Sequence, residues 1–128
     1  MATIFIVDDD QAIGEMLSLV LENEGFQTVT CLDGLRAVEM FPIVKPDLIL
    51  LDVMLPGLDG ISLLQSAAAS GLCPMVLVTS RFYNDYVLTA LGELSVGYMM
   101  RKPCDIPATA ARIGDLSRQI RTPLVTPP

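Results

Sequence analysis

Carboxylates directly follow two apolar runs of this chain, and their placement is the feature most closely connected with chemistry. The run at 48–51 leads into Asp52, and the run at 4–7 leads into three consecutive acids. These three acids are Asp8, Asp9 and Asp10. Short apolar runs are typical of buried strands, so two strands are predicted to end in carboxylates. Carboxylates a few ångströms apart repel each other unless a proton, a lysine or a hard cation lies between them.

A positive charge and a hydroxyl group follow two further apolar runs. Lys102, one of only two lysines, follows the run at 96–100, and Thr79 closes the run that begins at Met75. Each of these polar residues alone is most simply a turn former or a solvated group. Their joint occurrence at four predicted strand ends favours a common site.

Helical periodicity fills the intervals between the runs. Apolar residues recur at helical spacing over 13–21, with Gly25 as a stop signal. A further strand is predicted over 26–32. It leads into a short helix with apolar residues over 35–41, which we expect to break at Pro42.

Three more helices are predicted in the second half of the chain. One is capped by Asp59 and ended by Gly71, one covers 83–94, and the last begins after a cap at Asp105 and tolerates Pro107 in its first turn. Five strands alternating with five helices imply an α/β fold with a parallel sheet covered on both faces. Ligands of such sheets bind beyond the carboxyl ends of the strands, where the polar residues described above are placed.

Composition indicates one domain, which we place at 1–120 with a proline-rich tail or linker at 121–128. The chain has 128 residues, 52% of them apolar, and a net charge of −7. Its apolar stretches are shorter than the ~18 residues of a spanning helix, so we expect a cytoplasmic protein with no membrane partner. The acidic balance argues against nucleic-acid binding by this domain itself. Its three cysteines, without any histidine, form no metal-ligand pattern.

The chain resembles the receiver domain of two-component response regulators, the family that includes CheY, over residues 2 to about 120. The motifs that carry the resemblance are Val7-Asp8-Asp9-Asp10, the segment 51–60, Thr79-Ser80 and Lys102-Pro103. Residues 2–65 are especially similar to receivers joined to winged-helix transcriptional regulators. The resemblance implies a doubly wound, flavodoxin-like (βα)5 fold with a five-stranded parallel sheet in the order 2-1-3-4-5.

The resemblance makes Asp52 the phosphorylated residue. A carboxylate can attack phosphorus, and phosphoryl transfer mainly requires alignment and neutralisation of charge. The family pattern also implies Mg²⁺, a cis bond before Pro103, and a catalytic role for Thr79 and for Lys102, which is expected to pair with Asp52. The implied metal ligands are Asp9, Asp52, the backbone carbonyl of Met54 and, through water, Asp8. Asp10, where the family often has Glu, is expected to cap the first helix.

Two neighbouring residues are candidates for the switch residue that transmits the conformational change. Related receivers couple the hydroxyl residue, here Thr79, to an aromatic residue three positions before the lysine. Counting back from Lys102 gives Met99, with Tyr98 one position too far. A strand bulge would restore Tyr98 to that position.

We therefore expect a receiver that takes a phosphoryl group from a sensor histidine kinase or a phosphotransfer protein. It would change the surface of its fourth helix, fifth strand and fifth helix, where a homodimer is possible, to control an output domain. Such a protein is not an enzyme with a separate substrate, although it catalyses its own phosphorylation and dephosphorylation. The alternative is a receiver-fold interaction module that works without phosphorylation. A dehalogenase-like phosphatase would need an acid where Met54 stands, and three aspartates after the first strand would repel a nucleotide phosphate.

Overall fold

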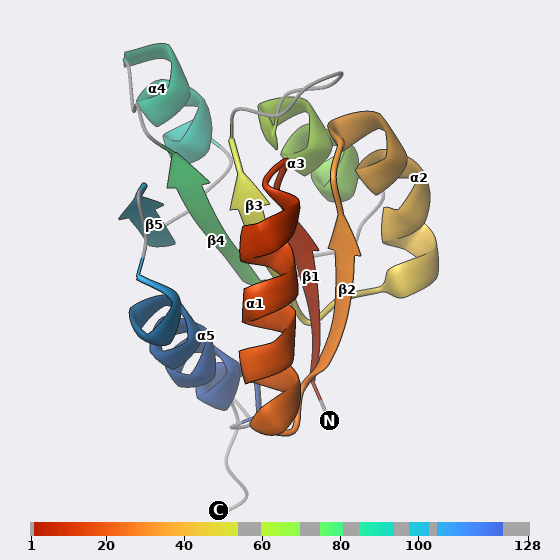
Figure 1. Ribbon diagram of the computed structural model, residues 1–128. Helices are drawn as coiled ribbons and strands as arrows, with labels where there is room; N and C mark the ends of the chain where they lie inside the picture. Colours follow the sequence, from red (N-terminus) through yellow and green to blue (C-terminus); the bar gives the residue numbers. More distant parts are fainter. Residues whose placement is uncertain are drawn as a thin grey trace, which may run out of the picture.

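Strands and helices alternate strictly along the chain (Figure 1). The computed structural model describes residues 2–53, 60–69, 75–80, 85–93, 98–102 and 105–121. The strands are β1 (Thr3–Val7), β2 (Gln27–Cys31), β3 (Leu48–Asp52), β4 (Met75–Ser80) and β5 (Tyr98–Arg101). The helices are α1 (Gln11–Asn23), α2 (Gly34–Val44), α3 (Gly60–Ala69), α4 (Asp85–Glu93) and α5 (Ile106–Arg121).

The five strands form one parallel sheet in the order β2-β1-β3-β4-β5, which confirms the predicted fold and strand order. β3 lies at the centre and all five of its residues are buried, whereas the edge strand β2 is largely half-buried or exposed. A central strand covered on both faces needs apolar side chains on both, which explains the unbroken run at 48–51.

Alternating side chains of the strands enter two separate cores. Ile4 and Ile6 pack with the buried faces of α1 and α5, whereas Phe5 and Val7 pack with residues of α2, α3 and α4. α1 and α5 therefore cover one face of the sheet and the other three helices contact the opposite face (Figure 1).

Local signals determine both ends of α1, as predicted. The Asp10 side chain accepts a hydrogen bond from the Ile13 N–H at 3.2 Å and caps the helix. Gly25 has a φ of +97°, and the Phe26 N–H donates to the Leu21 carbonyl at 3.1 Å, which closes the last turn.

The prediction that the second helix breaks at Pro42 is wrong, because α2 continues through Pro42 to Val44. Proline in the last turn removes only one N–H donor, while the buried Phe41 and the partly buried Val44 hold this turn against the core. The helix ends at Lys45, whose backbone is left-handed with a φ of 47° and whose N–H donates to the Phe41 carbonyl at 3.0 Å.

The remaining helices begin and end near their predicted positions. α4 continues through Gly92, and α5 begins directly after Asp105, with Pro107 in its first turn. Several predicted features lie outside the described residues: the cap at Asp59, the stop at Gly71 and the tail after Arg121. In the part of the chain that the structure describes, none of the helices combines the length and apolar character needed to cross a membrane.

Candidate functional site

The carboxyl edge of the sheet brings together the acids that follow β1 and β3. These strands are neighbours with Val7 paired to Leu51, so the residues after them emerge side by side. Asp8 and Asp52 are only 6% and 5% exposed, and Asp9 lies open to solvent. One carboxylate oxygen from each of the three acids lies within 4.8 Å of the others. The predicted convergence of the acids is therefore present.

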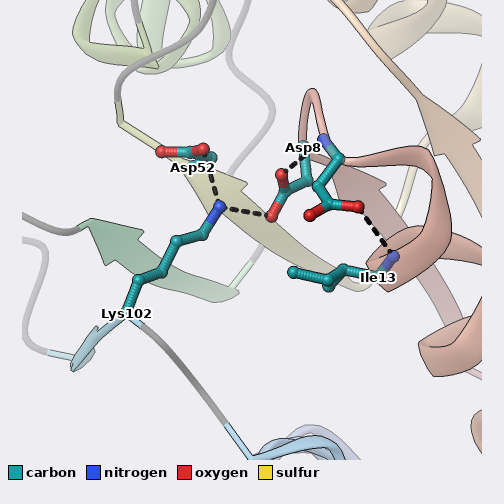
Figure 2. A network of polar contacts seen from close by, with 5 residues as sticks. Asp8, Ile13, Asp52 and Lys102 are labelled. Atoms are coloured by element: carbon teal, nitrogen blue, oxygen red, sulfur yellow. Dashed lines mark hydrogen bonds and ion pairs between the residues drawn. The ribbon is translucent and has the colours of Figure 1, made fainter.

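Lys102 reaches into this acidic cluster from the far side of β4. Its Nζ lies 2.8 Å from Asp52 Oδ2 and 2.8 Å from Asp8 Oδ2, so the ammonium group bridges both buried carboxylates (Figure 2). The backbone N–H of Lys102 donates to the Ser80 carbonyl at 2.9 Å, which anchors the backbone from which the Lys102 side chain extends. Sequence reasoning predicted the contact with Asp52 and missed the one with Asp8, because that contact depends on side-chain reach across the sheet.

The two ion pairs set the protonation of Lys102. Burial alone would lower the pKa of this amine, but hydrogen bonds and charge attraction from Asp52 and Asp8 together raise it above its ordinary value of 10.5. Lys102 is therefore a permanent positive charge at neutral pH.

The second oxygen of Asp8 organises the turn that follows β1. Its Oδ1 accepts the Asp10 N–H at 2.9 Å, so Asp8 is held by the turn on one side and by Lys102 on the other. Asp10 is directed to the N-terminus of α1, where it caps the Ile13 N–H, as expected. Asp9 is the exposed acid of the cluster.

The acids fit a small, hard divalent cation. Three carboxylates from Asp8, Asp9 and Asp52 face one ammonium group, which leaves the cluster with excess negative charge. Carboxylate oxygens are the preferred ligands of Mg²⁺, which keeps several of its waters and needs few protein ligands. The remaining expected ligand, the Met54 carbonyl, and the bond before Pro103 lie outside the described residues.

Thr79 lies directly beside Asp52 on the neighbouring strand. The two residues are paired in the register of β3 and β4, and the Val53 N–H donates to the Thr79 carbonyl at 3.0 Å. Thr79 is 4% exposed, and Ser80 after it is fully buried. Paired residues of parallel strands direct their side chains to the same face, so the Thr79 hydroxyl and the Asp52 carboxylate share one side of the sheet.

The two candidate switch residues lie on opposite faces of β5. Pairing with β4 runs one to one from Tyr98 to Arg101, so this part of the strand contains no bulge. Tyr98 is half-buried with the α1 and α5 core, and the Arg112 guanidinium lies 5.7 Å from its ring centroid. Met99 points to the other face and is 45% exposed. Because the register is regular, Met99 keeps the position three residues before Lys102, where related receivers have an aromatic residue.

The geometry agrees with comparison to known proteins. The family model of the response regulator receiver domain matches residues 4–113. This chain belongs to that family. Receiver domains are the response regulator modules of two-component systems. In this chain the five-stranded sheet has the order β2-β1-β3-β4-β5, as the resemblance predicted.

Relatives with transcriptional names support the predicted resemblance. The receiver domain is 37% identical over 107 residues to the DNA-binding response regulator MtrA of Mycolicibacterium paratuberculosis, covering 82% of this chain and 48% of MtrA. It is 36% identical over 116 residues to the transcriptional regulatory protein CseB of Streptomyces coelicolor, covering 91% of this chain and 49% of CseB. The chain thus spans about half the length of these curated relatives. Among solved structures, the receiver domain of the Francisella response regulator 1452 matches with a TM-score of 0.81 and 25% identity, over 94% of this chain and 99% of that one.

Proposed function

We propose that this receiver domain accepts a phosphoryl group on Asp52 in a Mg²⁺-dependent reaction, with a sensor histidine kinase or a phosphotransfer protein as donor. One observation carries the proposal: Asp52 ends the central strand with its carboxylate 2.8 Å from the Lys102 ammonium and within 4.8 Å of carboxylate oxygens of Asp8 and Asp9. A buried carboxylate beside a fixed cation and a cation-binding cluster suits the transfer of a highly charged group.

The residues support each requirement of the transfer. A carboxylate oxygen of Asp52 forms the new bond to phosphorus, while the bond from phosphorus to the donor breaks and the donor keeps that electron pair. The product is an acyl phosphate on Asp52. Lys102, which pairs with Asp52, would hold a phosphoryl oxygen by charge, and the Thr79 hydroxyl, on the same side of the sheet, would donate a hydrogen bond to another.

Mg²⁺ would be held by Asp9 and Asp52, with Asp8 contributing through water and the Met54 carbonyl as a third protein ligand. When bound, it supplies positive charge that reduces repulsion between the acids and the incoming phosphoryl oxygens. The exposed Asp9 gives the site a side open to solvent, whereas Asp8 and Asp52 are buried.

The signal would leave through α4, β5 and α5. This surface includes the exposed side chains Tyr86, Leu88 and Met99. We propose that it contacts an output domain or a second copy of the receiver. The curated relatives are named as DNA-binding and transcriptional regulators, and the chain spans about half of their length, so a DNA-binding output domain is the favoured partner.

The proposal is tested by phosphorylation with acetyl phosphate. The protein with Mg²⁺ should gain one phosphoryl group per chain by intact mass, and Asp52→Asn should gain none. Asp85→Asn, which removes an exposed acid of α4, is the matched control and should behave as the parent does. Removal of Mg²⁺ with a chelator should abolish the gain. A parent that takes up no phosphoryl group would contradict the proposal and favour an interaction module that works without phosphorylation.

A further inference from the structure

Gly60, the first residue of α3, lies directly on the backbone of Asp52, the last residue of β3, and of Val53 after it. Its N–H donates to the Val53 carbonyl at 2.9 Å. A Cβ atom added to Gly60 would lie 2.9 Å from Val53 Cα, 3.0 Å from the Asp52 carbonyl oxygen and 3.2 Å from the Val53 carbonyl oxygen. All three contacts are with backbone atoms, so no flexible side chain can move aside to make room.

This glycine is required for space and not for an unusual backbone angle. Among the glycines that the structure describes, only Gly25 has a positive φ. Two other helical glycines are not crowded in this way, because a Cβ atom on Gly14 would meet nothing closer than 3.9 Å and one on Gly92 would meet nothing within 4 Å. The close approach therefore distinguishes Gly60 from these ordinary helix glycines.

The contact restrains the backbone that carries Asp52. On the β4 side, the Val53 N–H donates to the Thr79 carbonyl at 3.0 Å, and on the α3 side the Val53 carbonyl accepts from Gly60 at 2.9 Å. The Asp52 to Val53 segment is thus held between β4 and the start of α3. Its carboxylate must point at once to Lys102 and to the oxygens of Asp8 and Asp9, so a backbone shift of some tenths of an ångström would misdirect it.

We propose that Gly60 is a positioning residue for Asp52: its missing side chain lets α3 rest on the end of β3 and so aims the phosphoacceptor at the cation site. This inference rests on the proposed function of Asp52. It assigns to Gly60 a role in metal binding and phosphoryl acceptance, exerted through the backbone of residues 52–53.

The test compares Gly60→Ala with Gly92→Ala in the full chain. Titration with MgCl₂, followed by amide NMR, should show a Kd raised about tenfold or more in Gly60→Ala, with slower uptake from acetyl phosphate. Gly92→Ala adds the same methyl group to an exposed helix position and should keep the parental Kd. A Gly60→Ala protein that is less stable but binds Mg²⁺ as the parent does would overturn the proposal and make Gly60 a packing residue only.

A second measurement needs no variant and applies even if Gly60→Ala does not fold. In the parent, the Gly60 amide signal should shift on MgCl₂ addition with the same midpoint as the Asp9 and Asp52 amides. A Gly60 signal that stays fixed while those two shift would overturn the positioning role alone. A parent in which none of the three responds would overturn the proposed metal site together with this inference.

Discussion

Lys102 is the residue on which the charge balance of the site depends. It supplies the ammonium group that lies between Asp8 and Asp52, and its side chain is only 10% exposed. Two carboxylates this deeply buried need a paired charge, because each loses most of its hydration. In the absence of metal, Lys102 acts as the cation of the site.

Replacing Lys102 with Met should therefore lower the free energy of unfolding by about 3 kcal/mol without metal, since it leaves two buried acids facing each other. Urea unfolding measures this loss. Arg118→Met is the matched control, because it removes an ion pair with Asp115 that is 70% and 59% exposed, and it should cost about 0.5 kcal/mol or less. Equal losses of unfolding free energy in the two variants would show that the buried ion pairs of Lys102 stabilise the fold no more than an exposed ion pair does.

The raised pKa of Lys102 gives this contribution a defined pH dependence. Because the folded pKa lies above the ordinary 10.5, the stabilisation is complete below pH 10.5 and is lost as pH rises through the folded value. The difference in unfolding free energy between the parent and Lys102→Met should stay constant from about pH 7 to about pH 9 and shrink at higher pH. A difference that stays constant or grows as pH rises above about 10 would mean that the ion pairs do not raise this pKa.

Met99 and Tyr98 should respond differently to phosphorylation. Tyr98 is held between the α5 core and Arg112, whereas the exposed Met99 has a flexible thioether that repacks at little cost. With Mg²⁺ and beryllofluoride, the methyl signal of Met99 should shift in protein labelled at methionine methyl groups, and the Tyr98 ring signals should stay in place. Met100, half-buried on the face of Tyr98, is the internal control. Displacement of the Tyr98 ring with a stationary Met99 would reverse the assignment.

At the scale of the element, helix ends show how local sequence determines structure. Asp10 and Gly25 carried clear cap and stop signals, and both act as predicted. Lys45 carried no such signal, yet it ends α2 with a left-handed φ of 47°. This conformation costs a residue with a Cβ atom about 1 kcal/mol, so the end of α2 is strained.

Lys45→Gly should consequently raise the free energy of unfolding by about 0.5 to 1 kcal/mol relative to Lys45→Ala. Both variants remove the same charge, and only glycine relieves the left-handed backbone. Paired urea denaturation curves measure the difference. An alanine variant as stable as the glycine variant would show that this backbone conformation costs nothing here.

Features that depend on periodicity and on strand ends could be predicted from the sequence, and those that depend on tertiary distance could not. The strand order and the convergence of Asp8, Asp9, Asp52 and Lys102 follow from apolar runs and a family resemblance. Pro42 misled the prediction because packing of its neighbours outweighs one lost hydrogen bond. The close approach of Gly60 was also missed, since its neighbours are revealed only when α3 lies on β3.

At the scale of the whole molecule, the crossover topology makes one site from distant parts of the chain. Placing β1 beside β3, and β4 between β3 and β5, aligns four strand ends along one edge of the sheet (Figure 1). Lys102, which is 50 positions from Asp52 in the chain, thereby lies 2.8 Å from its carboxylate, while the two sheet faces remain apolar cores. The polar cluster therefore lies at one edge of the sheet, and we propose that the response passes through the α4 and β5 side.

The central claim is that Asp52 is the phosphoacceptor, and chemical mapping of the modified residue tests it most directly. The full chain, treated with acetyl phosphate and Mg²⁺, is reduced with borohydride, which converts an aspartyl phosphate to homoserine, and its peptides are sequenced by mass spectrometry. We predict the modification at Asp52 alone, with Asp8 and Asp9 unmodified in the same digest. A label on Asp8, Asp9 or Asp10, with Asp52 intact, would contradict the account.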